Sequence, residues 1–255
     1  MAKIISFANQ KGGVGKTTSA INVTASLGSL GKHVLLIDID PQGNCSSGVG
    51  INKKLIKGSV YDVLINKASA KQMIIKTPYE NLSVLPSTID LAGAELELGD
   101  ISHREAVLKN ALSELTDDYD YIIIDLPPSL GLLTINALTA SNSVIVPMQC
   151  EYFALEGLSQ LVYTIKQVKE MYNPKLELEG VILTMFDGRL NLSLAVAAEI
   201  KKHFPGKTFR NAVPRNVRLS EAPSHGKPIL YYDKYSRGGL AYLEISRELL
   251  ERDSK

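Results

Sequence analysis

Cysteine and long apolar runs are scarce in this sequence of 255 residues. Its two cysteines, Cys45 and Cys150, are too few for a disulfide framework, and in a reducing cytosol we expect both to be packing residues. No run of about 18 apolar residues occurs, so no membrane-spanning helix is predicted. The first residues also lack the basic region, apolar core and cleavage site of a signal peptide. We therefore expect a cytoplasmic protein with no membrane partner.

Linkers, low-complexity runs and internal repeats are also missing, which predicts one domain over residues 1–255. The net charge is only +1, so the whole chain does not indicate a polyanionic partner. The charge is nevertheless segregated. Residues 185–237 hold ten lysines and arginines against four acidic residues. Such a block predicts contacts to the phosphates of DNA without reading of its sequence.

The stretch from Asn9 to Thr18 predicts a phosphate-binding loop, because it lies between an apolar strand (residues 3–8) and a helix (residues 19–30). Backbone N–H groups around Gly12, Gly13 and Gly15 could surround phosphate oxygens, with help from the helix N-terminus. Lys16 would neutralise phosphate charge and Thr17 would bind Mg²⁺. The expected nucleotide-binding residues of the loop are Lys11, Gly12, Gly13, Val14, Gly15, Lys16, Thr17 and Thr18. The alternative is a glycine loop of purely structural origin.

The loop departs from the common phosphate-loop pattern, since Gln10 stands where glycine is usual and an additional lysine, Lys11, follows it. The segment Lys-Gly-Gly-Val-Gly-Lys-Thr-Thr resembles the deviant Walker A box of the ParA/MinD ATPases. In that family the first lysine reaches the nucleotide of a partner subunit. The resemblance therefore implies an ATP-dependent homodimer in which Lys11 acts across the interface.

Two further apolar strands end in acidic residues. Residues 33–43 carry Asp38 and Asp40, whose side chains would share one direction if the strand ran through both, and residues 121–128 carry Asp125. Carboxylates at the carboxyl edge of parallel strands face the crevice where phosphates bind. By resemblance to the family, Asp38 and Asp125 support hydrated Mg²⁺, and Asp40 orients or deprotonates the attacking water. Acids at solvated strand ends are the alternative.

The remaining pattern predicts an α/β fold: a doubly wound, mainly parallel sheet with helices on both faces, as in P-loop NTPases. Expected strands cover residues 82–86, 143–148 and 178–184, and expected helices cover residues 91–98, 105–115, 154–171, 191–203 and 240–255. Residues 48–89 indicate no chemistry. Residues 213–228 read as a long loop, where the resemblance suggests Pro214 and Asn216 as contacts to adenine. An ordinary surface loop is the alternative.

The resemblance extends over residues 11–18, 34–43, 121–131, 149–157 and 214–228, and the short chain without a helix-turn-helix extension is most similar to Soj-type ParA ATPases. It implies ATP and ADP with Mg²⁺ as ligands, hydrolysis by Lys11, Lys16 and Asp40, non-specific binding of double-stranded DNA, and a ParB-type centromere protein that stimulates turnover. It also implies association with the nucleoid. Arg189 and Arg218 stand where the family places its DNA-binding arginines, although each could be a solvated charge.

Alternatives share the same three nucleotide motifs. A MinD-like membrane-cycling ATPase ends in a basic amphipathic helix, whereas the tail here mixes both charges. A bacterial tyrosine kinase would fit the late tyrosines Tyr231, Tyr232, Tyr235 and Tyr242, but these come before or within the last predicted helix and do not form a free terminal cluster. A scaffold that binds ATP without turnover is disfavoured by Asp40. Two cysteines could also ligate an iron–sulfur cluster, as in nitrogenase-type reductases, but their positions argue against it.

Overall fold

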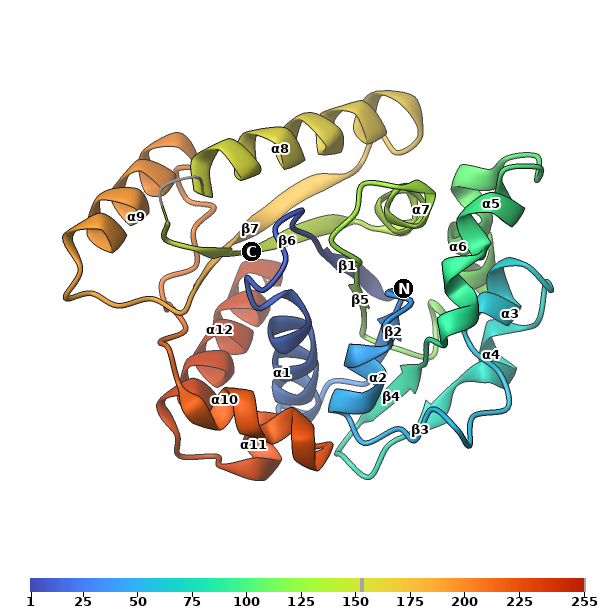
Figure 1. Ribbon diagram of the computed structural model, residues 1–255, viewed down its shortest axis with the longest axis horizontal. Coiled ribbons are helices and arrows are strands. Elements are labelled where there is room, and N and C mark those ends of the chain that lie inside the picture. Colours follow the sequence, from blue (N-terminus) through green and yellow to red (C-terminus); the bar gives the residue numbers. More distant parts are fainter. Residues whose placement is uncertain (152–153, 255) are drawn as a thin grey trace.

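The computed structural model describes residues 1–151 and 154–254, so residues 152 and 153 of the family-like segment 149–157 lie outside it. Its described residues form one seven-stranded sheet with the order β3-β4-β2-β5-β1-β6-β7 (Figure 1). The strands are β1 Lys3–Phe7, β2 Val34–Asp38, β3 Ile75–Lys76, β4 Leu82–Leu85, β5 Tyr121–Asp125, β6 Ser143–Gln149 and β7 Glu177–Thr184.

Neighbouring strands run parallel except at the edge, where β3 pairs antiparallel with β4. The central strands β2 and β5 are buried along their whole length, and their side chains are apolar up to the terminal aspartate. This composition is typical of parallel strands covered on both faces. The predicted doubly wound, mainly parallel sheet is confirmed.

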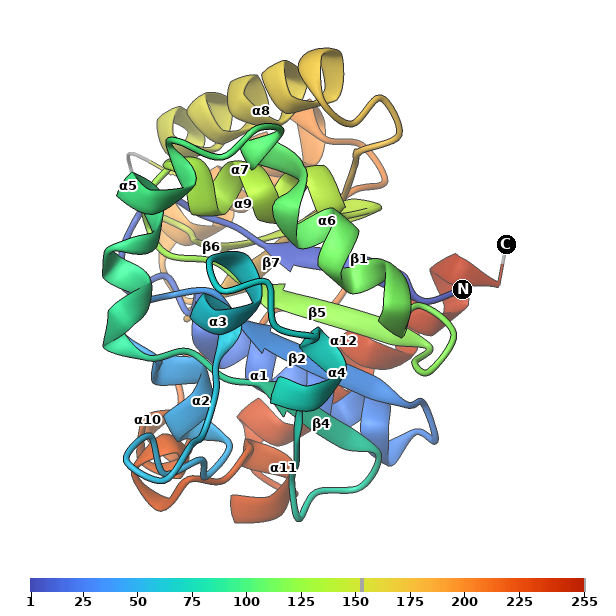
Figure 2. The ribbon, with the colours of Figure 1, turned by 90° about the vertical axis from the view of Figure 1, so that its right-hand side faces the viewer.

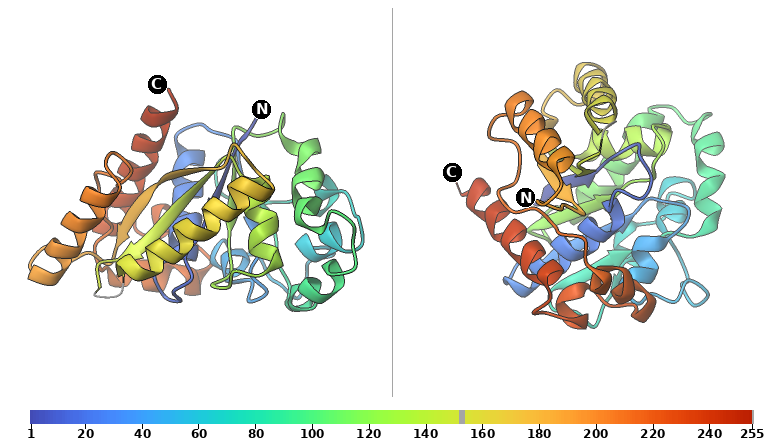
Figure 3. Two further views of the ribbon diagram at one scale, coloured as in Figure 1. Left: turned by 90° about the horizontal axis from the view of Figure 1, so that it is seen from above. Right: turned by 60° about the vertical axis from the view of Figure 1, so that its left-hand side comes forward.

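One face of the sheet packs on α1 and α12, which lie side by side (Figures 1 and 3). Side chains on this face alternate along the strands, as Ile5, Phe7, Val34 and Leu36 show, and they join Tyr242 of α12 in one core. The elements on this side of the sheet are α1 Lys16–Ser29, α2 Asn44–Gly48, α10 Val217–Glu221, η4 Ala222–His225, α11 Ile229–Tyr232 and α12 Arg237–Asp253.

The opposite core takes the alternate strand residues, such as Ile4, Leu35, Ile122 and Ile124. Figure 2 shows α3 to α6 in front of the sheet on this side, and α7 to α9 continue the layer. The elements are α3 Val60–Leu64, α4 Ala70–Met73, η1 Ile89–Ala92, α5 Ala94–Leu98, η2 Arg104–Ala106, α6 Val107–Leu112, η3 Ser113–Leu115, α7 Leu132–Ala140, α8 Ala154–Met171 and α9 Asn191–His203.

The structure corrects three expectations. Strand β2 ends at Asp38, so Asp40 lies beyond it and the two side chains do not share a strand face. The segment 213–228 is not a plain loop, because Asn216 caps the short helix α10 and Pro223 lies in the first turn of η4. The expected helices at 91–98 and 105–115 are each divided into short α and 3-10 turns.

Candidate nucleotide-binding site

The glycine-rich loop joins β1 to α1 at the carboxyl edge of the sheet. Gly13 and Gly15 have φ angles of 74° and 84°, in the left-handed region that favours glycine, and Gly15 is the N-cap of α1. A Cβ added at Gly12 or Gly13 would meet no heavy atom within 4 Å, so this part of the loop is open to a ligand. The loop therefore presents backbone N–H groups at a helix N-terminus, which is the arrangement that binds phosphate.

Two side chains hold the loop to neighbouring strands. Asn9 donates its Nδ2 to the carbonyl oxygen of Pro147 at 2.7 Å, and its Oδ1 accepts the backbone N–H of Lys11 at 3.0 Å. Thr184, the last residue of β7, donates its hydroxyl to the carbonyl of Val14 at 2.7 Å. Val14 is itself buried, so it shapes the loop from below. The sequence did not indicate Thr184, because its partner is distant in the chain.

A cleft of about 690 Å³ lies above the loop. Its loop side is formed by Gly12, Gly13, Gly15, Lys16, Thr17 and Thr18, and Asp40 lines the same cleft. Six predicted loop residues and the predicted catalytic carboxylate are thus brought together. The far end is lined by Met185, Pro223 and Ser224, which the sequence analysis did not single out.

Asp38 and Asp125 lie under the cleft as direct neighbours in the pairing of β2 with β5, and both are fully buried. Oδ2 of Asp38 accepts the backbone N–H and the hydroxyl of Ser46, each at 2.7 Å, and Oδ1 accepts the N–H of Asp40 at 3.2 Å. Burial raises the pKa of Asp38 to about 6, while the bonds from Ser46 oppose that rise.

Asp125 lacks such support. Neither of its carboxylate oxygens has a hydrogen-bond partner among the described residues. Burial, and next the charge of Asp38, raise its pKa to about 8, although the nearby side chains of Thr17 and Lys16 act in the other direction. Thr17 is close enough to lower this pKa but does not satisfy the carboxylate with a full hydrogen bond. A buried, unsatisfied carboxylate of this kind is well placed to receive a cation or its water ligands.

Lys16 and Asp40 flank the opening of the cleft. Burial lowers the pKa of Lys16, while the charges of Asp125 and Asp40 counteract the change. Oδ1 of Asp40 accepts the backbone N–H of Gln42 at 2.9 Å, which fixes the carboxylate in the turn after β2. Asp40 also lines the cleft.

The donor set fits Mg²⁺ bound together with a nucleotide. Across residues 1–151 and 154–254, no group of three or more His, Cys, Asp or Glu side chains could hold a metal by itself. Mg²⁺ retains water and takes phosphate oxygens as ligands, so it needs few protein groups. Thr17 and the two buried carboxylates would supply these groups, Asp38 and Asp125 through water.

Other predicted residues do not line the cleft. Lys11 is half-exposed and its Nζ is paired with the carboxylate of Glu151. Pro214 lines a neighbouring hollow, and the side chain of Asn216 accepts the N–H of Arg218 at 2.9 Å. The structure places neither Pro214 nor Asn216 on the wall of the nucleotide cleft, so adenine contact by these two residues stays a prediction. Arg189 and Arg218 are exposed, at the turn after β7 and in α10.

Other described residues bear on the alternative functions, namely a membrane-cycling ATPase, a tyrosine kinase and an iron–sulfur protein. Tyr242 is buried, with its hydroxyl 3.0 Å from that of Ser19, and α12 buries Ile245 and Leu249 against the core. Helix α12 is therefore packed on the domain, with Tyr242 in its core. Cys45 and Cys150 are free thiols, buried in opposite cores, as the packing interpretation expects. In the part of the chain that the structure covers, no helix is both long and apolar enough to cross a bilayer.

The fold and the phosphate loop define a P-loop NTPase. A family model described as an AAA domain matches residues 2–178. Soj, the sporulation initiation inhibitor protein of Bacillus subtilis, is 57% identical over 98% of each chain. The chromosome partitioning protein ParA of Myxococcus xanthus is 53% identical over 100% of this chain and 90% of its own. The crystal structure of cobyrinic acid a,c-diamide synthase from Mycobacterium smegmatis, with bound ADP and magnesium, is 36% identical with a TM-score of 0.87 and covers 100% of this chain and 96% of its own.

The chain belongs to the ParA/Soj family of P-loop ATPases. The family resemblance predicted from the motifs is confirmed. The expected ligands, an adenine nucleotide and Mg²⁺, are those that the M. smegmatis structure contains.

Proposed function

We propose that this protein is a DNA-partitioning ATPase in which Mg-ATP drives a homodimer, the dimer binds DNA without sequence specificity, and hydrolysis releases it. The observation that carries the proposal is the convergence of Lys16, Thr17 and Asp40 on an open glycine loop above two buried carboxylates. The names of the curated relatives, Soj and chromosome partitioning protein ParA, support a role in partitioning.

Hydrolysis would take place at the mouth of the cleft. The N–H groups of the glycine loop and Lys16 bind and orient the phosphates, and bound Mg²⁺ would supply further neutralisation of their charge. Asp40 lies in the same cleft, where its carboxylate can orient the attacking water and accept its proton. Asp38 is buried, and its carboxylate accepts hydrogen bonds from Ser46 and from the backbone N–H of Asp40, so we assign it no proton transfer.

Lys11 is the residue that would connect the two subunits. Its pair with Glu151 is exposed, with side chains 47% and 51% accessible, and an exposed ion pair is worth roughly 0–1 kcal/mol. A phosphate of the partner's nucleotide can therefore displace Glu151 at little cost. We infer that Lys11 moves from Glu151 to this phosphate when two subunits face each other across their nucleotides, which makes the dimer depend on ATP.

DNA binding is assigned to the basic segment 185–237, which includes Arg189 and Arg218. Joining two subunits doubles the number of phosphate contacts for each particle, so the affinity for DNA should rise steeply on dimerisation. We propose that a ParB-type centromere protein completes the water-positioning geometry and stimulates turnover. The protein would then act in the cytoplasm on the nucleoid.

The test is co-sedimentation with non-specific double-stranded DNA in the presence of ATP, ADP or no nucleotide, with liposomes as a parallel arm. We expect the protein to pellet with DNA only with Mg-ATP and not to pellet with liposomes. The variant Arg189→Glu with Arg218→Glu should lose DNA binding and retain its ATP-dependent dimer in light scattering. An Asp40→Ala variant that remains a single subunit with saturating Mg-ATP would refute the dimer switch, and pelleting with liposomes would favour the MinD-like alternative.

A further inference from the structure

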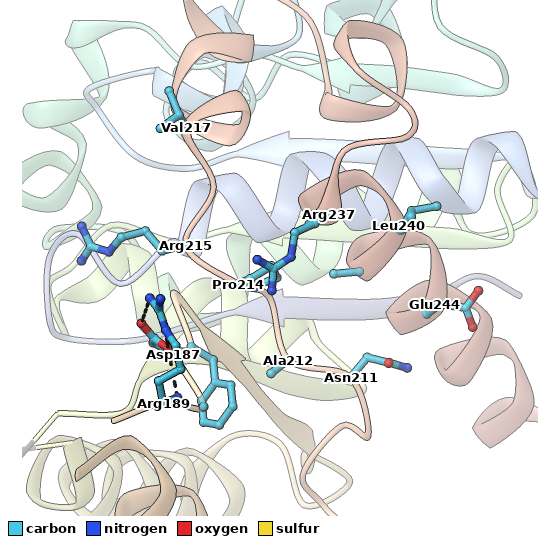
Figure 4. Close-up of a pocket in the computed structure, with 13 residues that line it drawn as sticks. Asp187, Arg189, Asn211, Ala212, Pro214, Arg215, Val217, Arg237, Leu240 and Glu244 are labelled. Carbon is cyan, nitrogen blue, oxygen red and sulfur yellow. Dashed lines mark hydrogen bonds and ion pairs between the residues drawn. The ribbon is translucent and has the colours of Figure 1, made fainter. Parts of the chain in front are cut away.

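Both arginines expected at the DNA surface are already engaged by carboxylates of the same chain. Arg189 donates from Nε to Oδ1 of Asp187 at 2.9 Å and from Nη2 to Oδ2 at 2.6 Å, as the dashed lines in Figure 4 indicate. Its backbone N–H also donates to Oδ1 of Asp187 at 3.0 Å. These bonds hold the pKa of Asp187 well below its usual range, so the carboxylate stays ionised.

Arg218 is held in a similar way from two sides. Its Nη1 donates to Oε2 of Glu221 at 2.9 Å, and its Nε lies 3.5 Å from Oδ2 of Asp233. The hydroxyl of Tyr232 donates to the same oxygen of Glu221 at 3.2 Å, which fixes the position of that carboxylate. Both arginines are thus paired although their side chains are 88% and 54% accessible.

Two other arginines lie close by without a direct ion pair to a carboxylate among the described residues, although the charge of Arg237 contributes to the low pKa of Asp187. Arg215 and Arg237 line a hollow of about 960 Å³ together with Asp187 and Arg189 (Figure 4). Among the described residues, neither Arg215 nor Arg237 takes part in an ion pair. Glu244 lines the same hollow, but its carboxylate is paired with Arg247 of its own helix.

We propose that Asp187 competes with the phosphates of nucleic acid for Arg189. Glu221 and Asp233 act in the same way on Arg218, and Arg215 and Arg237 are the cations free at first contact. A phosphate offers a guanidinium group the same paired oxygens and the same sign of charge as a carboxylate. On the edge of Arg189 formed by Nε and Nη2, the carboxylate of Asp187 must therefore leave before a phosphate can bind. The inference rests on the proposed DNA binding and adds that these carboxylates limit the affinity for DNA.

The competition has a consequence for the nucleotide switch. A single subunit must break these pairs for few phosphate contacts, whereas a dimer makes twice as many contacts on one DNA molecule. The carboxylates would therefore keep the affinity of the monomer low and let the dimer leave DNA quickly once it separates. The carboxylates would thus determine how strongly the affinity for DNA depends on dimerisation.

The test uses fluorescence anisotropy with a labelled DNA duplex of arbitrary sequence and a non-hydrolysable ATP analogue. Asp187→Asn removes the charge but keeps an oxygen that can accept the N–H of Arg189. Glu244→Gln is the matched control, because it removes one negative charge from the same hollow without freeing an arginine that lines it. Arg189→Ala, alone and combined with Asp187→Asn, completes a double-mutant cycle.

We expect Asp187→Asn to bind DNA about threefold to tenfold more tightly than the natural protein, the range that exposed charge pairs allow when two copies act together. Glu244→Gln should gain less than about twofold, and the gain of Asp187→Asn should vanish when Arg189 is alanine. Equal gains at Asp187 and Glu244, or a gain that survives Arg189→Ala, would reduce the effect to overall charge and overturn the inference. If the natural protein and every variant failed to bind DNA, the proposed function would fall and the inference with it.

Discussion

Replacing Asp125 with asparagine should stabilise the protein without ligand at high pH and prevent its stabilisation by Mg-ATP. Asp125 is fully buried with no hydrogen-bond partner among the described residues, and its pKa rises from an ordinary 3.8 to about 8. The folded protein therefore keeps this proton over a range in which the unfolded chain has lost it. The contribution of Asp125 to stability should fall as the pH rises from about 4 to about 8, because this side chain binds fewer protons in the unfolded state there.

The size of the effect follows from the same shift. One pH unit inside this window costs about 1.4 kcal/mol, so the natural protein should lose on the order of 4 kcal/mol between about pH 5 and about pH 8 from this group alone. Asparagine does not titrate, and its buried amide adds a cost of about 1–3 kcal/mol that does not depend on pH. The variant should thus be similar to or less stable than the natural protein near pH 5, and more stable near pH 8.

The assay is urea unfolding at these two pH values with a chelator and no nucleotide, followed by the same measurement with Mg-ATP. Mg-ATP should raise the stability of the natural protein, since a ligand that binds only the folded state stabilises it. The variant should respond much less. If the natural protein and Asp125→Asn showed the same change in unfolding free energy between the two pH values, the pKa of Asp125 would not be raised in the folded protein as we argue.

Three further substitutions test single roles in the cleft. Lys16→Ala should abolish ATP binding, and retained affinity for a fluorescent ATP analogue would refute its role. Asp40→Ala should keep ATP-driven dimers and DNA binding but stop phosphate release, whereas normal release would assign the water to another group. Ser46→Ala should raise the Mg²⁺ concentration needed for tight nucleotide binding by about tenfold, because Ser46 fixes Asp38. Ser46→Thr keeps the hydroxyl and should restore the natural Mg²⁺ requirement. An unchanged Mg²⁺ titration with a lower melting temperature would leave Ser46 only a structural role.

The sequence predicted the elements whose pattern is long and regular. Strand β5 and helices α8 and α9 begin and end where they were expected, because a continuous apolar run or an amphipathic period marks them. Helix α7 was missed since seven of its nine residues are buried, so no polar face produces a helical period. Helix α2, with the sequence Asn-Cys-Ser-Ser-Gly, has low helix propensity and is held by Gly43 at its start and by the bonds from Ser46 to Asp38.

In the candidate site, too, some features could be predicted from the sequence and others could not. The order of the loop and the acidic strand ends was enough to predict residues that the structure brings to one edge of the sheet, because both depend on local chain geometry and on the common edge of parallel strands. Contacts between residues that are separated in the sequence could not be predicted from any local sequence pattern. Three such contacts are Glu151 with Lys11, Thr184 with Val14 of the loop, and Ser46 with Asp38. In the sequence, nothing distinguishes Glu151, Thr184 or Ser46 from other polar residues.

Helix α2 lines part of the nucleotide cleft and contacts two other segments. Ser46 within the helix binds Asp38, and Gly50, just after the helix, lies against Gly226 so closely that a Cβ on Gly226 would stand 2.7 Å from the Cα of Gly50. Gly226 follows η4, which supplies Pro223 to the cleft and continues from α10 with its Arg218. Closely packed backbones leave no free space in which a shift of one segment could be absorbed. If the segment after β2 moves during hydrolysis, the movement should displace η4 or open this contact, and either change would reach α10, which carries Arg218, the residue that we propose binds DNA.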